Sequence, residues 1–236
     1  LLQLCGNGDH IVSSRTVYGG THALLAELLP QLGITTTFVD AADLSAWKNA
    51  IRPETRVLYT EAIGNPTLKI ADIPSIARLA HDRGLQLVVD NTFSPMILSP
   101  HQLGADVVVY SLTKFINGSG DLIAGAICAN SELVQRLMDL HTGRVMLLGP
   151  TMDPTTAFEI IQRLPHLAIR MREHGRRAMA VAERLEALNT PVRYPGLDSH
   201  PQYEVMTAMM NHGFGFGGML NLDCKTRQKA EELMSI

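Results

Sequence analysis

The stretch Val107-Val-Val-Tyr-Ser-Leu-Thr-Lys-Phe-Ile-Asn-Gly-Ser-Gly-Asp121 indicates both a fold and a site. Its first four residues are typical of a strand buried in a sheet. Ser111, Thr113 and Lys114 follow directly, and a turn rich in glycine and serine comes next. Open α/β sheets carry their ligand sites just beyond the carboxyl ends of the strands. The stretch therefore predicts a lysine and two hydroxyl groups at such a site.

The chemistry of this site depends on how Lys114 is surrounded. Apolar walls disfavour the charged form of a lysine, which makes its amine a usable nucleophile. Ser111 and Thr113 could donate hydrogen bonds to a phosphate beside it. A lysine after a strand is more often a solvated loop residue, so the rest of the chain must decide between the two interpretations.

Composition limits the classes of protein that the chain can represent. Its 236 residues are 46% hydrophobic and 18% charged, which is typical of a globular protein with one large domain or slightly more. The net charge of −3 argues against nucleic-acid binding, and no apolar run approaches the ~18 residues of a membrane span. Cys5, Cys128 and Cys224 are too far apart for a metal site or a disulfide framework, so we expect no metal and a cytoplasmic location.

Two sequence features concern the ends of the chain and a glycine motif. Both ends show helix-like patterns without a clear start or stop, so we expect a fragment that begins inside a domain. The segment Gly213-Phe-Gly-Phe-Gly-Gly218 matches the spacing of a dinucleotide-binding fingerprint. It precedes an apolar strand pattern at 219–223 instead of following one, so we interpret it as a turn.

Strand and helix patterns alternate along most of the chain. The strands are expected at 10–14, 35–39, 56–60, 85–89, 107–110 and 123–129. The helices are expected from Thr21, at 44–51 with an Asp43 cap, at 74–83, and from a Ser131 cap to about 141. This alternation predicts an α/β fold, with a mostly parallel sheet sandwiched by helices.

The pattern changes after Pro154, where a long helical stretch runs to about Leu188 with a break near Pro165. We expect residues 1–165 to form a large domain that binds a cofactor. Residues 166–236 would begin a smaller, incomplete α+β C-terminal domain. Four charged residues of the helical stretch are expected to be solvated: Glu159, Arg163, Arg170 and Arg172.

Polar side chains follow several of the predicted strands, and in a parallel sheet these strand ends share one edge. The candidates are Tyr18, Glu61, Asn65, Asp90, Ser111, Thr113 and Lys114. This set suits pyridoxal phosphate, which needs a lysine for attachment and a carboxylate to keep its ring nitrogen protonated. It also needs a phosphate cradle and a flat surface against the ring. Lys114 would provide the attachment, and Asp90 would provide the carboxylate. The Ser111 and Thr113 hydroxyls would form part of the phosphate cradle, and Tyr18 would give the flat surface. Asn65 could hydrogen-bond the ring hydroxyl.

Each candidate also has a simpler interpretation. Asp90 before Asn-Thr could form an Asx turn, and Tyr18 could be a hydrophobic plug. Asn65 before Pro66 could only form a turn, and Glu61 suits a partner for a nearby donor better than a catalyst. One shared explanation nevertheless covers the whole set.

Five motifs resemble the Cys/Met-metabolism family of pyridoxal-phosphate enzymes, which includes cystathionine γ-lyase, cystathionine γ-synthase and methionine γ-lyase. They are Tyr18-Gly-Gly-Thr, Glu61-Ala-Ile-Gly-Asn-Pro-Thr, Val88-Val-Asp-Asn-Thr-Phe, Ser111-Leu-Thr-Lys-Phe and Tyr194-Pro-Gly-Leu-Asp-Ser-His-Pro-Gln. The segments 146–152 and 170–174 are most similar to methionine γ-lyases. The resemblance implies a fold-type I large domain, the site roles given above, and a stacking Tyr18 that also assists the leaving group.

The resemblance implies a carbon–sulfur lyase that converts L-methionine to methanethiol, 2-oxobutanoate and ammonia by α,γ-elimination. It also implies a sulfur-containing amino-acid substrate and a homotetramer built as a dimer of dimers. The alternatives are cystathionine γ-lyase, cystathionine γ-synthase or O-acetylhomoserine sulfhydrylase activity, and, in another class, a non-catalytic nucleotide-binding α/β module. Gly20 stands where bacterial methionine γ-lyases carry a cysteine. Three features that the family implies are absent from this chain: an N-terminal Tyr-x-Arg, a Ser-Gly-Met phosphate turn and a late substrate-binding arginine.

Overall fold

A six-stranded sheet forms the centre of the computed structural model, which describes residues 1–235. Its strand order is β2-β1-β3-β4-β5-β6. The strands are β1 (His10–Ser14), β2 (Thr35–Val39), β3 (Thr55–Glu61), β4 (Gln86–Asp90), β5 (Val107–Ser111) and β6 (Gly125–Ala129). β1 to β5 are parallel and β6 pairs with β5 in the antiparallel direction, which confirms the mostly parallel sheet.

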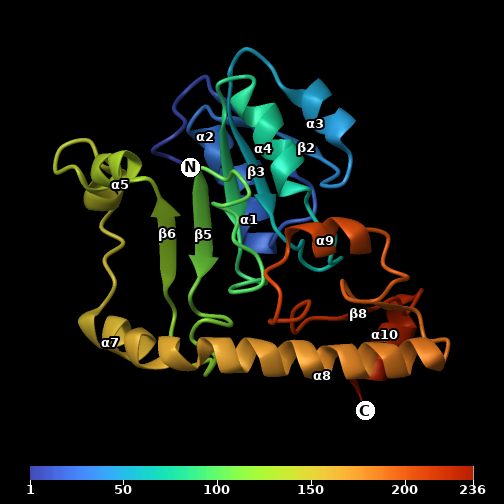
Figure 1. Cartoon of the computed structure of the whole chain (residues 1–236). Coiled ribbons are helices and arrows are strands. Elements are labelled where there is room, and N and C mark those ends of the chain that lie inside the picture. Colours follow the sequence, from blue (N-terminus) through green and yellow to red (C-terminus); the bar gives the residue numbers. More distant parts are fainter. Residues whose placement is uncertain (236) are drawn as a thin grey trace.

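Helices connect and flank these strands (Figure 1). They are α1 (Gly19–Ala23), α2 (Leu29–Gln31), α3 (Leu44–Ala50), α4 (Ile73–His81), α5 (Ser131–Met138), α6 (Arg144–Leu148), α7 (Pro154–Arg163), α8 (Leu167–Ala187), α9 (Tyr203–Met209) and α10 (Arg227–Met234). One π-helical turn, Leu24–Leu28, joins α1 to α2. Figure 1 shows α8 running past the carboxyl end of β5, so this long helix lies near the predicted site.

Several local predictions can be compared with the structure. The Asp43 carboxylate accepts a hydrogen bond from the Ala46 N–H at 3.0 Å, which confirms this helix cap. The Ser131 cap was wrong, because Asn130 caps α5 and accepts from the Leu133 N–H at 2.8 Å. The strand expected at 219–223 shortens to β8 (Asn221–Leu222), which pairs with β7 (Val192–Arg193). The glycine motif before β8 forms turns, as predicted.

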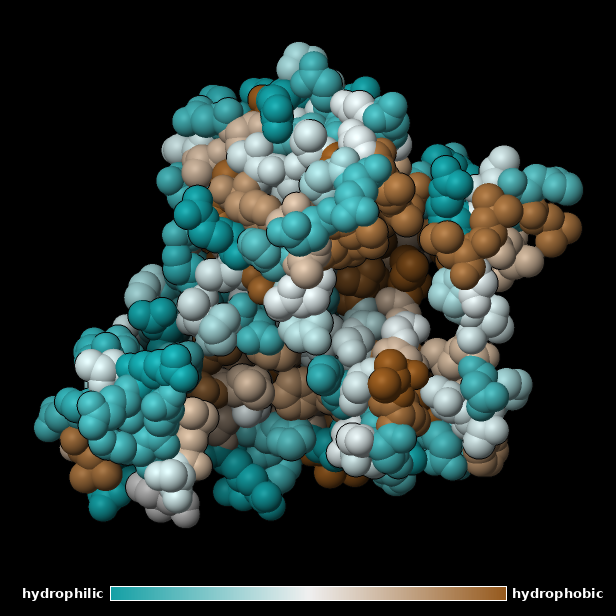
Figure 2. Space-filling view, turned by 180° about the vertical axis from the view of Figure 1, so that it is seen from behind, coloured by the Kyte–Doolittle hydropathy of each residue, from teal (hydrophilic) through white to brown (hydrophobic). Residues whose placement is uncertain are grey.

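Both faces of the sheet carry buried apolar side chains, because neighbouring strand residues point to opposite faces. Leu58 and Leu87 face one cluster, with Trp47 and Ile76 from the helices. A second cluster on the other face contains Ile11, Leu25, Leu29, Val57 and Tyr59. Part of this second face stays open, and Figure 2 shows apolar atoms gathered in the hollow beside α5.

The helical stretch breaks where the sequence indicated, since Pro165 lies in a 3₁₀ turn between α7 and α8. The domain boundary at residue 165 remains a prediction. Among residues 1–235, no helix has the length and apolar character needed to cross a membrane, and no group of His, Cys, Asp and Glu could hold a metal ion.

Candidate active site

The carboxyl ends of β3, β4 and β5 lie side by side. Glu61, the last residue of β3, pairs in register with Asp90, the last residue of β4, and Asp90 pairs with Val109 of β5. Ser111 therefore lies just beyond Asp90 along the neighbouring strand. The topology thus brings the predicted carboxylate and the lysine-bearing stretch to one edge of the sheet.

Glu61 joins two of the loops at this edge. Its side chain is buried, with only 6% of the residue exposed. One carboxylate oxygen accepts the Tyr18 N–H at 2.6 Å, and the other accepts the Asn65 N–H at 2.8 Å. This confirms that Glu61 is a partner for nearby donors. Because both loops bear candidate site residues, Glu61 sets the relative position of Tyr18 and Asn65.

Burial raises the pKa of Glu61 to about 7, and the charge of Asp90 adds to this effect while the two N–H donors oppose it. The folded protein therefore holds the Glu61 proton more tightly than the unfolded chain does. This contribution to stability is fully present below about pH 4.5 and is lost as the pH rises through about 7.

The Glu61→Gln variant should remove this pH dependence, because glutamine does not titrate. The free energy of unfolding of the parent chain minus that of the variant should fall by up to ~3 kcal/mol between about pH 5 and about pH 8. Urea unfolding of both proteins across this range measures the difference. A difference that stays constant or grows with pH would contradict the raised pKa of Glu61.

Asp90 forms the Asx turn that was one of its two interpretations, since its Oδ1 accepts the Thr92 N–H at 2.9 Å. The turn leaves acceptor capacity, because a carboxylate offers about four lone-pair sites. Burial raises the pKa of Asp90, and hydrogen bonds from Thr92 and Tyr59 oppose that effect. A half-buried carboxylate at a strand end is compatible with a role as partner of a ring nitrogen.

Thr92 is a residue that the sequence interpretation missed. Its hydroxyl accepts the Ser111 N–H at 2.8 Å, which connects the loop after β4 to the end of β5. In the Asp-Asn-Thr motif, the sequence indicates a role only for the carboxylate. A threonine two residues beyond a strand gives no local signal of a contact to the neighbouring strand.

Tyr18 presents its ring at the surface, because 56% of the residue is exposed. It is therefore not a buried plug, and the ring can stack on a flat ligand. Gly20 lies beneath this ring, since a Cβ at Gly20 would stand only 2.7 Å from the Tyr18 Cε1 atom. Any side chain at position 20 would force the ring to move.

The other candidate residues, Lys114, Thr113 and Asn65, make few side-chain contacts with the rest of the site. Lys114 is exposed, and its side-chain amine makes no hydrogen bond or ion pair within residues 1–235. The backbone N–H of Lys114 donates to the Ser111 carbonyl at 3.3 Å. The Thr113 hydroxyl accepts the Ala124 N–H at 3.0 Å and donates to the Ala124 carbonyl at 3.3 Å, so it is occupied in holding its own loop. Asn65 contributes its backbone N–H to Glu61.

A cavity of about 450 Å³ lies elsewhere, lined by Lys69, Ile70, Arg193, His200 and Gln202 among others. Its lysine forms an ion pair with Asp40. An amine paired in this way is less available as a nucleophile than that of Lys114. The chemistry therefore favours the strand ends over this cavity.

The strand-end residues fit pyridoxal phosphate. The edge carries a half-buried carboxylate at Asp90 and an exposed aromatic ring at Tyr18. It also carries the Lys114 amine, which has no partner among residues 1–235. The Ser111 hydroxyl has no hydrogen-bond partner within the described residues and could serve a phosphate group. These are the kinds of groups that the cofactor requires.

Comparisons with known proteins agree with this chemistry. A methionine gamma-lyase of Arabidopsis thaliana is 53% identical over all of this chain, and an O-succinylhomoserine sulfhydrylase of Pseudomonas aeruginosa is 36% identical over 95% of it. The crystal structure of cystathionine gamma-lyase from Lactobacillus plantarum complexed with L-serine superposes with a TM-score of 0.84 at 33% identity, over 92% of this chain. The chain covers 54%, 55% and 56% of these three proteins, about half of each.

The family model described as Cys/Met metabolism PLP-dependent enzyme matches residues 1–236. It extends over every candidate site residue and confirms the resemblance inferred from the motifs. The chain belongs to the Cys/Met metabolism family of PLP-dependent enzymes.

Proposed function

We propose that the complete protein is a PLP-dependent carbon–sulfur lyase that converts L-methionine to methanethiol, 2-oxobutanoate and ammonia. The observation that carries this proposal is the 53% identity to a methionine gamma-lyase along the full length of this chain. The arrangement of Asp90, Glu61 and Ser111 at adjoining strand ends supports it. Family membership also favours an enzyme over a nucleotide-binding module without catalysis.

The cofactor would supply an electron sink for the negative charge that develops at the substrate α-carbon. Lys114 would carry the cofactor and, once its amine is free, would take up the α-proton. The Asp90 carboxylate would hold a proton on the ring nitrogen. Ser111 would bind the phosphate, and Thr113 would join it by turning its hydroxyl proton away from the Ala124 carbonyl. Asn65 would contact the ring hydroxyl.

Tyr18 would have two tasks, because its ring can stack on the cofactor and its hydroxyl can protonate the departing thiolate. The Tyr18→Phe variant keeps the ring and loses the hydroxyl. We expect its kcat for methionine to fall by ~10²-fold while its affinity for pyridoxal phosphate changes little. Steady-state kinetics together with a cofactor titration separate the two tasks. A variant with the parent kcat would contradict the role of the hydroxyl.

A second candidate function keeps the cofactor and changes the reaction. Gly20 lets the Tyr18 ring lie close to the backbone. The family resemblance implies that glycine at this position is common in the cystathionine enzymes, which suits cystathionine cleavage or γ-replacement on an activated homoserine. Product analysis of the intact protein with methionine, cystathionine and O-acetylhomoserine distinguishes these reactions. Methanethiol and 2-oxobutanoate from methionine as the main products would support the lyase, and their absence would refute it.

We also propose that the intact protein is a homotetramer in the cytoplasm. Large apolar side chains on α7 and α8 are exposed, including Phe158, Ile161 and Ile169, as are Ile123 and Leu148. Such exposure is typical of surfaces that another chain covers. The three cysteines are free, which suits a reducing compartment. The molecular mass in solution, measured by ultracentrifugation, tests the assembly.

A further inference from the structure

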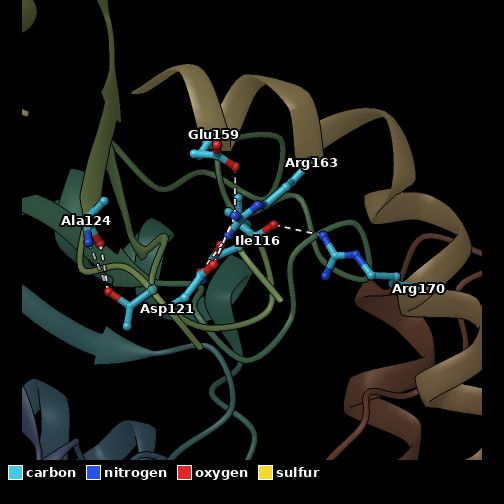
Figure 3. A network of polar contacts seen from close by, with 8 residues as sticks. Ile116, Asp121, Ala124, Glu159, Arg163 and Arg170 are labelled. Carbon is cyan, nitrogen blue, oxygen red and sulfur yellow. Dashed lines mark hydrogen bonds and ion pairs between the residues drawn. The ribbon is translucent and has the colours of Figure 1, made fainter. Parts of the chain in front are cut away.

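The loop that follows Lys114 is fastened to the long helix α8. The Arg170 guanidinium donates one hydrogen bond to the Phe115 carbonyl and another, at 2.8 Å, to the Ile116 carbonyl (Figure 3). Phe115 and Ile116 are the two residues that directly follow the lysine. The expectation that Arg170 is a solvated helix charge was therefore wrong.

Gly118 allows Arg170 to approach this loop. Its φ of +77° lies in the left-handed region that favours glycine. A Cβ at this position would also collide with the Arg170 guanidinium. In addition, the Gly118 N–H donates to the Lys114 carbonyl at 2.8 Å. The glycine thus closes the turn around Lys114 and leaves room for the arginine that holds it.

A second arginine holds the far side of the same loop. Arg163 at the end of α7 donates to the side chain of Asn117, which is buried, and makes two bonds to the Asp121 carboxylate at 2.6 and 3.0 Å. Glu159 accepts from the same guanidinium at 2.8 Å. This arginine was also expected to be solvated, and its contacts contradict that expectation. Residues 115–121 are therefore anchored at both ends by the α7–α8 helices.

We propose that Arg170 is a positioning residue for Lys114. This inference rests on the proposed attachment of the cofactor to Lys114. A lysine amine lies at the end of four rotatable bonds, so its placement depends on a fixed backbone at its base. By holding the carbonyls of Phe115 and Ile116, Arg170 restricts the turn from which the amine extends. Small displacements of a reacting group lower rates strongly, even when the changed residue lies far from the chemistry.

The test compares variants of the intact protein, prepared without cofactor and then mixed with pyridoxal phosphate. The rate at which the visible absorption band forms reports how well the Lys114 amine is placed. We expect this rate to fall by ~10-fold in Arg170→Met and to recover partly in Arg170→Lys, which keeps one donor group. Gly118→Ala leaves the arginine in the chain but blocks its approach, and should slow band formation similarly. Hydrogen exchange of residues 112–121 should become faster in both.

The matched control is Arg177→Met, which removes an exposed arginine of the same helix whose partner within the described part of the chain is Glu173. It should form the band at the parent rate. If Arg170→Met and Gly118→Ala unfold at lower temperature but form the band at the parent rate, the arginine only stabilises the fold and the proposal is overturned. If the unaltered protein forms no band, the proposed function fails, and the positioning role fails with it.

Discussion

Replacing Lys114 with alanine should lower the rate of 2-oxobutanoate formation from methionine by at least ~10³-fold in the intact protein. The lysine would both carry the cofactor and move the α-proton, and alanine can do neither. The variant should also lack the visible absorption band after incubation with pyridoxal phosphate. An assay of 2-oxobutanoate formation tests the loss of rate, and an absorption spectrum tests the loss of the visible band.

Lys48→Ala is the matched control, because Lys48 is exposed on α3 and contacts no candidate site residue in the described range 1–235. It should keep the parent rate and spectrum. A Lys114→Ala protein that is folded and retains more than about a tenth of the parent rate would refute the assignment of this lysine.

The Asp90→Asn variant should lose ~10²- to 10³-fold in kcat. Asparagine has the same shape and can still accept the Thr92 N–H that Asp90 accepts at 2.9 Å, so the turn should survive. It carries no negative charge, however, and cannot hold a proton on the ring nitrogen. The loss should therefore appear in kcat, with little change in the melting temperature.

Asp106→Asn provides the comparison for Asp90→Asn. Asp106 lies just before β5, and its carboxylate accepts the Leu87 N–H at 2.7 Å. It is therefore a carboxylate at the amino ends of the strands, away from the site. Its variant should keep the parent kcat, and equal losses in both variants would show that Asp90 acts only through the fold.

Most strands could be predicted from the sequence because their signals are local. β1 and β2 occur where their apolar and β-branched runs indicate, and the ends of β3, β4 and β5 differ from the expected bounds by at most one residue. The antiparallel direction of β6 could not be predicted, since nothing within Gly125–Ala129 records which way its partner runs. The choice between Asn130 and Ser131 as helix cap failed because both residue types cap helices well.

The candidate site also contains residues whose position could be predicted from the sequence and residues whose contacts could not. The shared position of Asp90 and Ser111 could be predicted because a parallel sheet brings strand ends to one edge. Thr92, Arg163 and Arg170 could not be found because their partners lie far along the chain. Arg170 contacts a carbonyl 55 residues away, and a charged residue on a helix has the same local pattern whether it is solvated or bound.

The most direct measurement for this account is borohydride reduction of the intact protein loaded with pyridoxal phosphate, followed by peptide mapping. If Lys114 is the residue that carries the cofactor at this sheet edge, the label will be found on the peptide that contains it. A label on any other lysine, including Lys69 beside the separate cavity, would contradict the account.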